Sequence, residues 1–175
     1  MKNSSVSIRG PVVDRQVALL SILGFWLFYM IIVTLRAAVL DFPAQGEMVV
    51  RRLVVTCFGI LATIVMYFAL RQFESRPLGI RIAAACLGAV PCSFAVAGFN
   101  YYVFNVYDPS SLFEGQEMAK QMIEFRPAVV FFESAVSNYF FIVSWAMLYL
   151  ALSYASEVRL AERRASRYAQ AAQQA

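Results

Sequence analysis

Four long apolar runs, separated by short polar segments, form the main pattern of this chain. We expect them to be membrane spans at 17–40, 49–70, 79–104 and 128–152, after a polar N-terminal segment at 1–16. About 20 consecutive apolar residues in a helix cross the hydrocarbon core of a bilayer. The first run is too long for the apolar part of a signal peptide, so we interpret it as an uncleaved span. The sequence therefore predicts an all-α fold, an integral membrane four-helix bundle.

Turn-forming residues mark the connections between these spans. Pro43 and Gly46 break the chain after the first run, and Pro77 precedes the third. The longest connection, an outer loop at 105–127, contains a turn followed by alternating apolar and acidic residues. This loop is either a plain linker or the site of a short interfacial helix at 112–125.

The last span continues into a charged, Ala-rich tail at 153–175 with no Gly or Pro. We expect this tail to be a cytoplasmic signalling or coiled-coil helix. Spacings of four and three residues define a heptad seam, flanked by Glu162 with Arg163 or Arg164. The alternative is a lone juxtamembrane helix whose arginines contact anionic lipids. The seam consists of Tyr154, Val158, Ala161, Ala165, Tyr168, Ala172 and Ala175.

Composition and charge narrow the classes of function. The chain is 61% hydrophobic, and its net charge of +4 comes from basic residues at the ends of apolar runs, which is not a nucleic-acid signature. It contains no His, and its three Cys lie in apolar runs, so we expect no metal site, cofactor or disulfide framework. Ten of the 15 Lys and Arg residues fall on the side of the two termini, which predicts that both termini are cytoplasmic.

Ionisable side chains inside a membrane are costly, and they are candidates for function. Arg36 and Glu133 lie at similar depth near the outer ends of the first and fourth spans, so we expect a partly buried pair. Three interpretations stay open: snorkelling to headgroups, a structural ion pair, or a ligand or signal site. Other groups expected at this level are Asn100, Tyr101, Arg51 and Arg52.

A polar stripe also follows the fourth span. Hydroxyl and amide groups in lipid usually hydrogen-bond across helices. We therefore expect interhelical or inter-subunit bonds from Ser134, Ser137, Asn138 and Ser144.

Four spans whose last helix continues into EVRLAERRASRYAQAAQQA resemble the N-terminal sensor region of LytS/YehU-type membrane histidine kinases. In that family a similar linker leads to a phosphoacceptor motif and then an ATP-binding domain. Neither of these is present in the 175 residues, so the resemblance transfers no catalytic residue and leaves open whether the protein is part of an enzyme. It implies a sensor module of a two-component system, in a bacterial inner membrane, with a response regulator as a partner downstream.

Two hypotheses of function follow. The first is a homodimeric sensor and dimerisation module that passes a signal through the fourth span to a cytoplasmic kinase beyond Ala175. The second is a stand-alone membrane scaffold or accessory subunit that uses its tail as a docking helix. A transporter or channel fits less well, because no internal repeat and no charged residue at mid-membrane is evident. Neither hypothesis names the stimulus.

Overall fold

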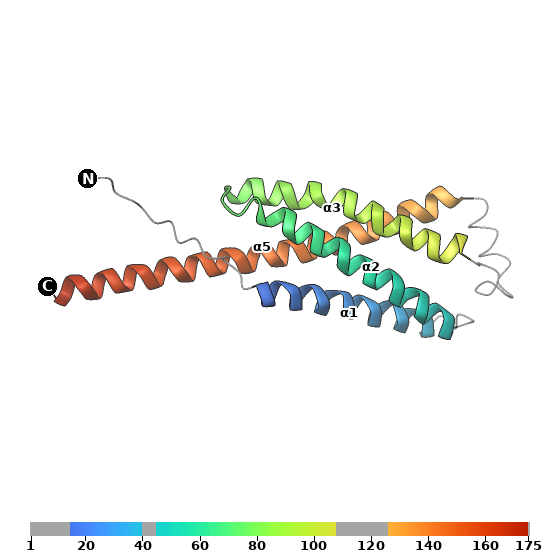
Figure 1. Ribbon diagram of the computed structural model, residues 1–175, viewed down its shortest axis with the longest axis horizontal. Helices are drawn as coiled ribbons and strands as arrows, with labels where there is room; N and C mark the ends of the chain where they lie inside the picture. Colours follow the sequence, from blue (N-terminus) through green and yellow to red (C-terminus); the bar gives the residue numbers. More distant parts are fainter. Residues whose placement is uncertain (1–14, 40–44, 108–125, 175) are drawn as a thin grey trace.

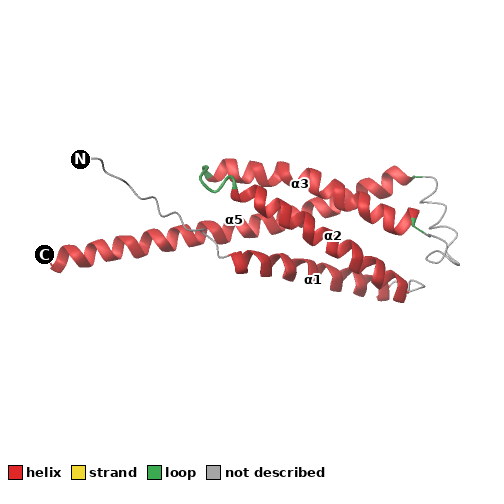
Figure 2. Cartoon of the chain, viewed as in Figure 1, coloured by secondary structure: helices red, strands yellow, loops and turns green. Residues whose placement is uncertain are grey.

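The computed structural model describes residues 15–39, 45–107 and 126–174. This part of the chain is entirely helical apart from short turns (Figure 2). Its elements are α1 (Arg15–Val39), α2 (Gln45–Arg71), α3 (Leu78–Tyr101), the π-helix η1 (Tyr102–Val106) and α5 (Pro127–Gln174). Four of the helices are long and apolar enough to cross a membrane. The predicted all-α fold with four membrane-spanning helices is thus confirmed.

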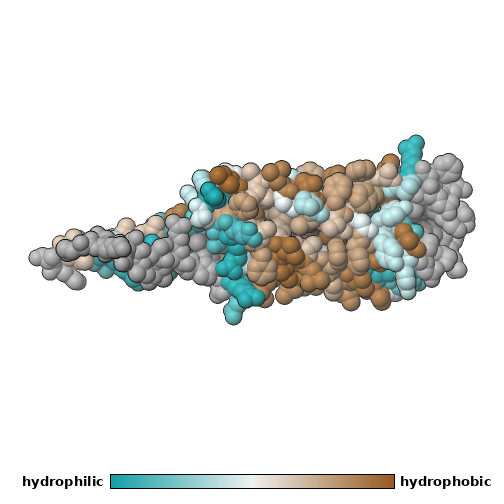
Figure 3. All heavy atoms as spheres, turned by 45° about the horizontal axis from the view of Figure 1, so that its top comes forward, coloured by the Kyte–Doolittle hydropathy of each residue, from teal (hydrophilic) through white to brown (hydrophobic). Residues whose placement is uncertain are grey.

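The four long helices lie side by side, with successive helices running in opposite directions (Figure 1). We call one end of the bundle the tail end: it holds the start of α1, the turn at 72–77 and the exit of α5. The opposite end, with Val39, Tyr107 and Arg126, is the loop end. An apolar band covers the bundle between more hydrophilic residues at the two ends (Figure 3), as expected for a protein that spans a bilayer.

Small residues allow α3 and α5 to pack closely. These two helices share the most extensive contact in the bundle, and Ala85 and Ala89 of α3 are fully buried. Without a hydrophobic driving force in lipid, helices associate through such close backbone approach. The α3–α5 pair therefore forms the packing centre to which the other helices are added.

Two tryptophan side chains attach α1 to its neighbours. Trp26 donates its indole N–H to Thr63 Oγ1 of α2 at 2.9 Å, and Thr63 in turn donates to the carbonyl of Gly59 at 2.8 Å. Trp145 of α5 donates its indole N–H to Ser21 Oγ at 3.1 Å. Both indoles are almost fully buried, so each N–H needs the partner it has found.

Helix α5 is much longer than the others. Its 48 residues correspond to a length of about 72 Å, which exceeds the thickness of a bilayer. Its first half packs in the bundle, and every described side chain from Val158 to Gln173 is exposed. The interfacial helix expected at 112–125 and the segment at 1–14 lie outside the described residues.

A methyl group at Gly59 would overlap the indole ring of Trp26. We expect Gly59→Ala to destabilise the protein by about 1–3 kcal/mol, the usual cost of overpacking. Thermal unfolding of the purified protein in detergent measures this change. The control is Gly24→Ala on α1, where the added methyl meets nothing within 4 Å. Equal melting temperatures for the two variants would contradict the packing of Trp26 on Gly59.

Candidate functional site

A buried arginine organises the loop end of the bundle. Arg51 of α2 is only 6% exposed, although it carries a full charge. Its Nη1 donates to the carbonyl oxygens of Val103 at 2.8 Å and Tyr107 at 2.6 Å, and its Nη2 donates to Glu47 Oε1 at 2.5 Å. The guanidinium also lies over the Tyr107 ring, 5.7 Å from its centroid. We call this set of contacts the arginine clamp.

The arginine clamp supplies hydrogen-bond donors to carbonyl groups at the end of η1. The last carbonyl groups of a helix have no partner within that helix. A guanidinium offers five donors in a fixed fork, so one side chain can serve two carbonyls and a carboxylate together. Arg51 therefore binds the first turns of α2 to the end of η1 and to Tyr107.

The neighbouring Arg52 makes weaker contacts. Its Nη2 lies 3.4 Å from Met48 Sδ. The Tyr101 carbonyl, by contrast, accepts a bond from Asn105 Nδ2 at 3.2 Å, inside the same turn of helix. Of the groups expected at this level, Arg51 and Asn100 join separate elements through their side chains.

The predicted Arg36–Glu133 pair is wrong. Both side chains are exposed, and none of the ion pairs among residues 15–39, 45–107 and 126–174 contains either of them. The two helices turn them outward: Ala37 is the buried residue beside Arg36, and Ala135 is the buried residue closest to Glu133. Depth along a helix can be read from sequence, whereas the direction around its axis depends on packing.

The polar stripe on α5 divides into two halves. Ser134 Oγ accepts a bond from Asn100 Nδ2 of α3 at 3.2 Å, and the buried Asn138 donates to the Ser134 carbonyl at 2.9 Å. The bond from Asn100 connects α3 to α5, whereas the bond from Asn138 stays within α5. Ser137 and Ser144 are exposed instead, and the Ser144 hydroxyl donates to the Phe140 carbonyl of its own helix at 2.7 Å.

A second polar network lies at the tail end, where α5 leaves the bundle. Arg81 of α3 donates from Nη1 to Glu157 Oε1 at 2.8 Å, from Nε to the Arg76 carbonyl at 2.9 Å, and from Nη2 to the Glu74 carbonyl. The Tyr149 hydroxyl donates to Glu74 Oε1 at 2.9 Å. We call the group of Glu74, Arg81, Tyr149 and Glu157 the tail latch.

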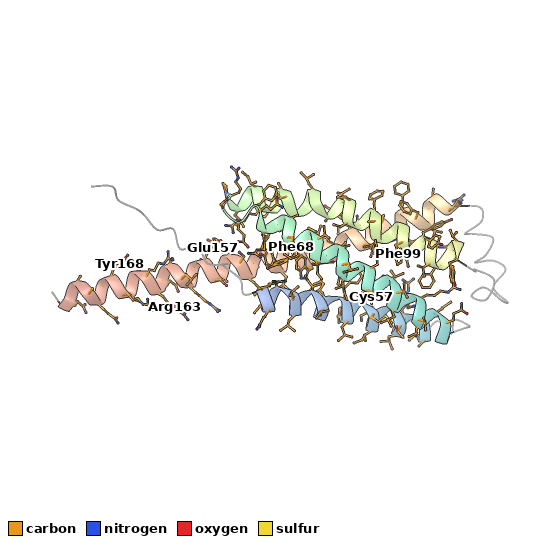
Figure 4. The ribbon with its side chains drawn as sticks, viewed as in Figure 1. Cys57, Phe68, Phe99, Glu157, Arg163 and Tyr168 are labelled. Carbon is orange, nitrogen blue, oxygen red and sulfur yellow. The ribbon has the colours of Figure 1, made fainter. Side chains whose placement is uncertain are left out.

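The tail latch attaches α5 at two points, two turns apart on α5: Tyr149 bonds to Glu74 in the turn between α2 and α3, and Glu157 bonds to Arg81 of α3. Glu157 lies at this exit point, while Arg163 and Tyr168 stand on the free part of the helix (Figure 4). No spacing rule links residues 76 positions apart, so the contact became visible only when the helices were packed.

The seam of the tail lies on the surface of the single chain. Tyr154, Val158, Ala161, Ala165, Tyr168 and Ala172 are all exposed, and Ala175 lies outside the described residues. The single chain thus leaves the seam uncovered over its described length.

Comparisons with family models, curated proteins and solved structures found no match to this chain.

We expect Arg51→Met to destabilise the bundle strongly, because two carbonyls and the Glu47 carboxylate lose their donor. Each bond to a charged group contributes about 1.5–3 kcal/mol. Thermal unfolding in detergent is the measurement, with the exposed Arg36→Met as the matched control. The clamp has no structural importance if the two variants melt at the same temperature.

The tail latch predicts a coupling between Arg81 and Glu157. In a double-mutant cycle of Arg81→Met and Glu157→Gln, we expect a coupling free energy of about 0.5–1 kcal/mol, because the Glu157 side chain is one-third exposed. The Arg159→Met and Glu157→Gln pair serves as control, since Arg159 is exposed on the free helix. Additive effects for Arg81 and Glu157 would show that the bond contributes nothing.

Proposed function

We propose that this chain is the membrane sensor and dimerisation module of a two-component signalling histidine kinase. The observation that supports this proposal is the continuity of α5, which runs as one helix from the loop end, through the bundle, into an exposed tail. A continuous helix transmits a rotation or a shift along its axis without losing it in a flexible joint. The resemblance of the tail to the linker of LytS/YehU-type kinases points to the same role.

In this proposal the loop end receives the signal. It holds the arginine clamp, whose bonds to the carbonyls of Val103 and Tyr107 depend on the position of the adjoining outer loop. A ligand or a change in the bilayer that moves this loop would alter how α2 and α3 pack. Because α3 carries the largest contact with α5, such a change reaches the signalling helix directly.

The tail latch then sets the resting position of α5. Its bonds are modest in energy, since they lie at a membrane surface and are partly exposed. A modest restraint suits a switch, because a signal of a few kcal/mol is enough to change the population of two states. Breaking the bond between Arg81 and Glu157 would free the tail to rotate.

The proposal also includes the orientation of the chain in the membrane and the proteins on which its tail acts. The excess of Lys and Arg at the tail end favours a cytoplasmic tail in a bacterial inner membrane. There the tail would act on a kinase domain, and through it on a response regulator. The protein itself supplies no catalytic group in this scheme.

The test is a fusion in which Gln174 is joined, in heptad register, to the phosphotransfer and ATP-binding domains of a histidine kinase. One to seven residues are then inserted after Leu160. Because each inserted residue turns a helix by about 100°, autophosphorylation should vary with insert length and recover at seven residues. An Arg81→Met fusion should differ in activity from the parent fusion.

Activity that stays constant across all inserts would refute transmission through α5. That outcome would favour the alternative, a membrane scaffold or accessory subunit whose tail docks on another protein.

A further inference from the structure

Within the membrane, α5 has two opposite faces. One face packs against the bundle, and its residues Ala135, Asn138, Ile142, Trp145 and Tyr149 are all buried. The other face points away from the bundle; we call it the outward face. At 100° per residue the centres of the two faces are roughly 170° apart, so contacts on one leave the other uncovered. The outward face consists of Glu133, Ser137, Phe140, Ser144, Met147, Ala151 and Tyr154, of which Met147 is partly buried against the core and the other six are exposed.

The outward face has the same register as the seam of the tail. Its spacings are 4, 3, 4, 3, 4 and 3 residues, and its last residue, Tyr154, is the first residue of the seam. No insertion or deletion interrupts the heptads between Glu133 and Ala172. Every seventh residue of this line is small or β-branched: Ser137, Ser144, Ala151, Val158, Ala165 and Ala172.

The chemistry of the outward face does not suit contact with lipid alone. Glu133 and Ser137 lie on an open stretch of the α5 surface, beside Phe132 and Val136. A carboxylate that faces hydrocarbon is costly, and a hydroxyl gains from a partner on another helix. Small side chains also leave room for a second helix backbone to approach.

We propose that a second copy of this chain packs along the whole outward face of α5, from Glu133 to Ala172. The two copies of α5 run parallel, because both chains have the same orientation in the membrane. On a straight α-helix, a stripe with strict heptad spacing drifts around the helix axis. The two helices therefore wind around each other in a left-handed supercoil, which keeps their stripes in contact. Membrane and cytoplasmic segments then belong to one interface, and Glu133 lies next to the Ser137 hydroxyl of the second copy.

The area of this surface is sufficient for a dimer. A helix offers a strip about 10 Å wide, and the 39 steps from Glu133 to Ala172 span about 60 Å. Each copy would thus bury roughly 600 Å², and the pair roughly 1,200 Å², which is the lower limit for a specific interface. The tail alone would bury less than half of that, so the membrane segment is needed.

This inference rests on the dimer in the proposed function and identifies its interface. The experiment uses the full chain in its native membrane, with Cys57, Cys86 and Cys92 replaced by Ala. Single cysteines are introduced by Ser137→Cys, Ser144→Cys, Ala151→Cys and, in the tail, Ala165→Cys. The controls are Leu61→Cys on α2 and Leu87→Cys on α3, two residues that are 61% and 72% exposed in the apolar band.

Oxidative cross-linking should be about tenfold greater at the four positions on the outward face and the seam than at the two controls. Helix association in membranes is strong enough to produce a ratio of this size. Cross-linking at Ala165 alone would overturn this inference but leave the dimeric tail of the proposed function intact. Equal cross-linking at these four positions and at the controls, or none at any position, overturns this inference as well.

A steric variant gives a second, independent readout. Ser144→Leu places a large side chain on the exposed outward face, where it cannot disturb the fold of one chain. We expect it to lower cross-linking at Ala165 several-fold, since both segments share one interface. Leu61→Phe, on the exposed face of α2, should leave it unchanged. Unchanged cross-linking in the Ser144→Leu variant would separate the two segments and refute the continuous interface.

Discussion

The unbroken backbone hydrogen bonding of α5 is the constraint on which the rest of the structure depends. In lipid, every backbone N–H and C=O must find a partner within the protein, and a helix supplies these partners from its own segment. Helix α5 keeps the same pattern for 48 residues, past the point where the apolar band ends. The other helices are organised around it: α3 packs along it, and α1 is attached to it through Trp145 and Ser21.

The two polar networks have similar chemistry but join different parts of the bundle. Arg51 donates to the carbonyls of Val103 and Tyr107 and to Glu47, so removing it takes a donor from all three acceptors. Arg81 likewise donates to the carbonyls of Arg76 and Glu74 and to Glu157, and its side chain is 11% exposed. The arginine clamp joins α2 to the end of η1 at the loop end, whereas the tail latch joins α3 and the turn before it to α5 where that helix leaves the bundle.

Much of the fold was predictable from hydropathy, because apolar runs of spanning length have few other solutions in a membrane. The direction in which each polar side chain points around its helix was harder to predict. Ser134 and Ser137 look alike in sequence, yet one accepts a bond from Asn100 and the other faces outward. The same limit produced the wrong Arg36–Glu133 pair. The clamp at Arg51 and the bond from Arg81 to Glu157 join positions that no short-range pattern connects.

The central claim is that α5 is a single helix whose outward face pairs with a second copy from the membrane into the tail. Distances between spin labels on the two copies, placed one at a time at Ser144, Ala151, Val158 and Ala165, test it most directly. Paired helices keep their axes about 8–10 Å apart, so the four distances should be short and similar. Distances that rise steadily from Ala165 toward Ser144, or that are too long to measure at all four positions, would contradict the claim.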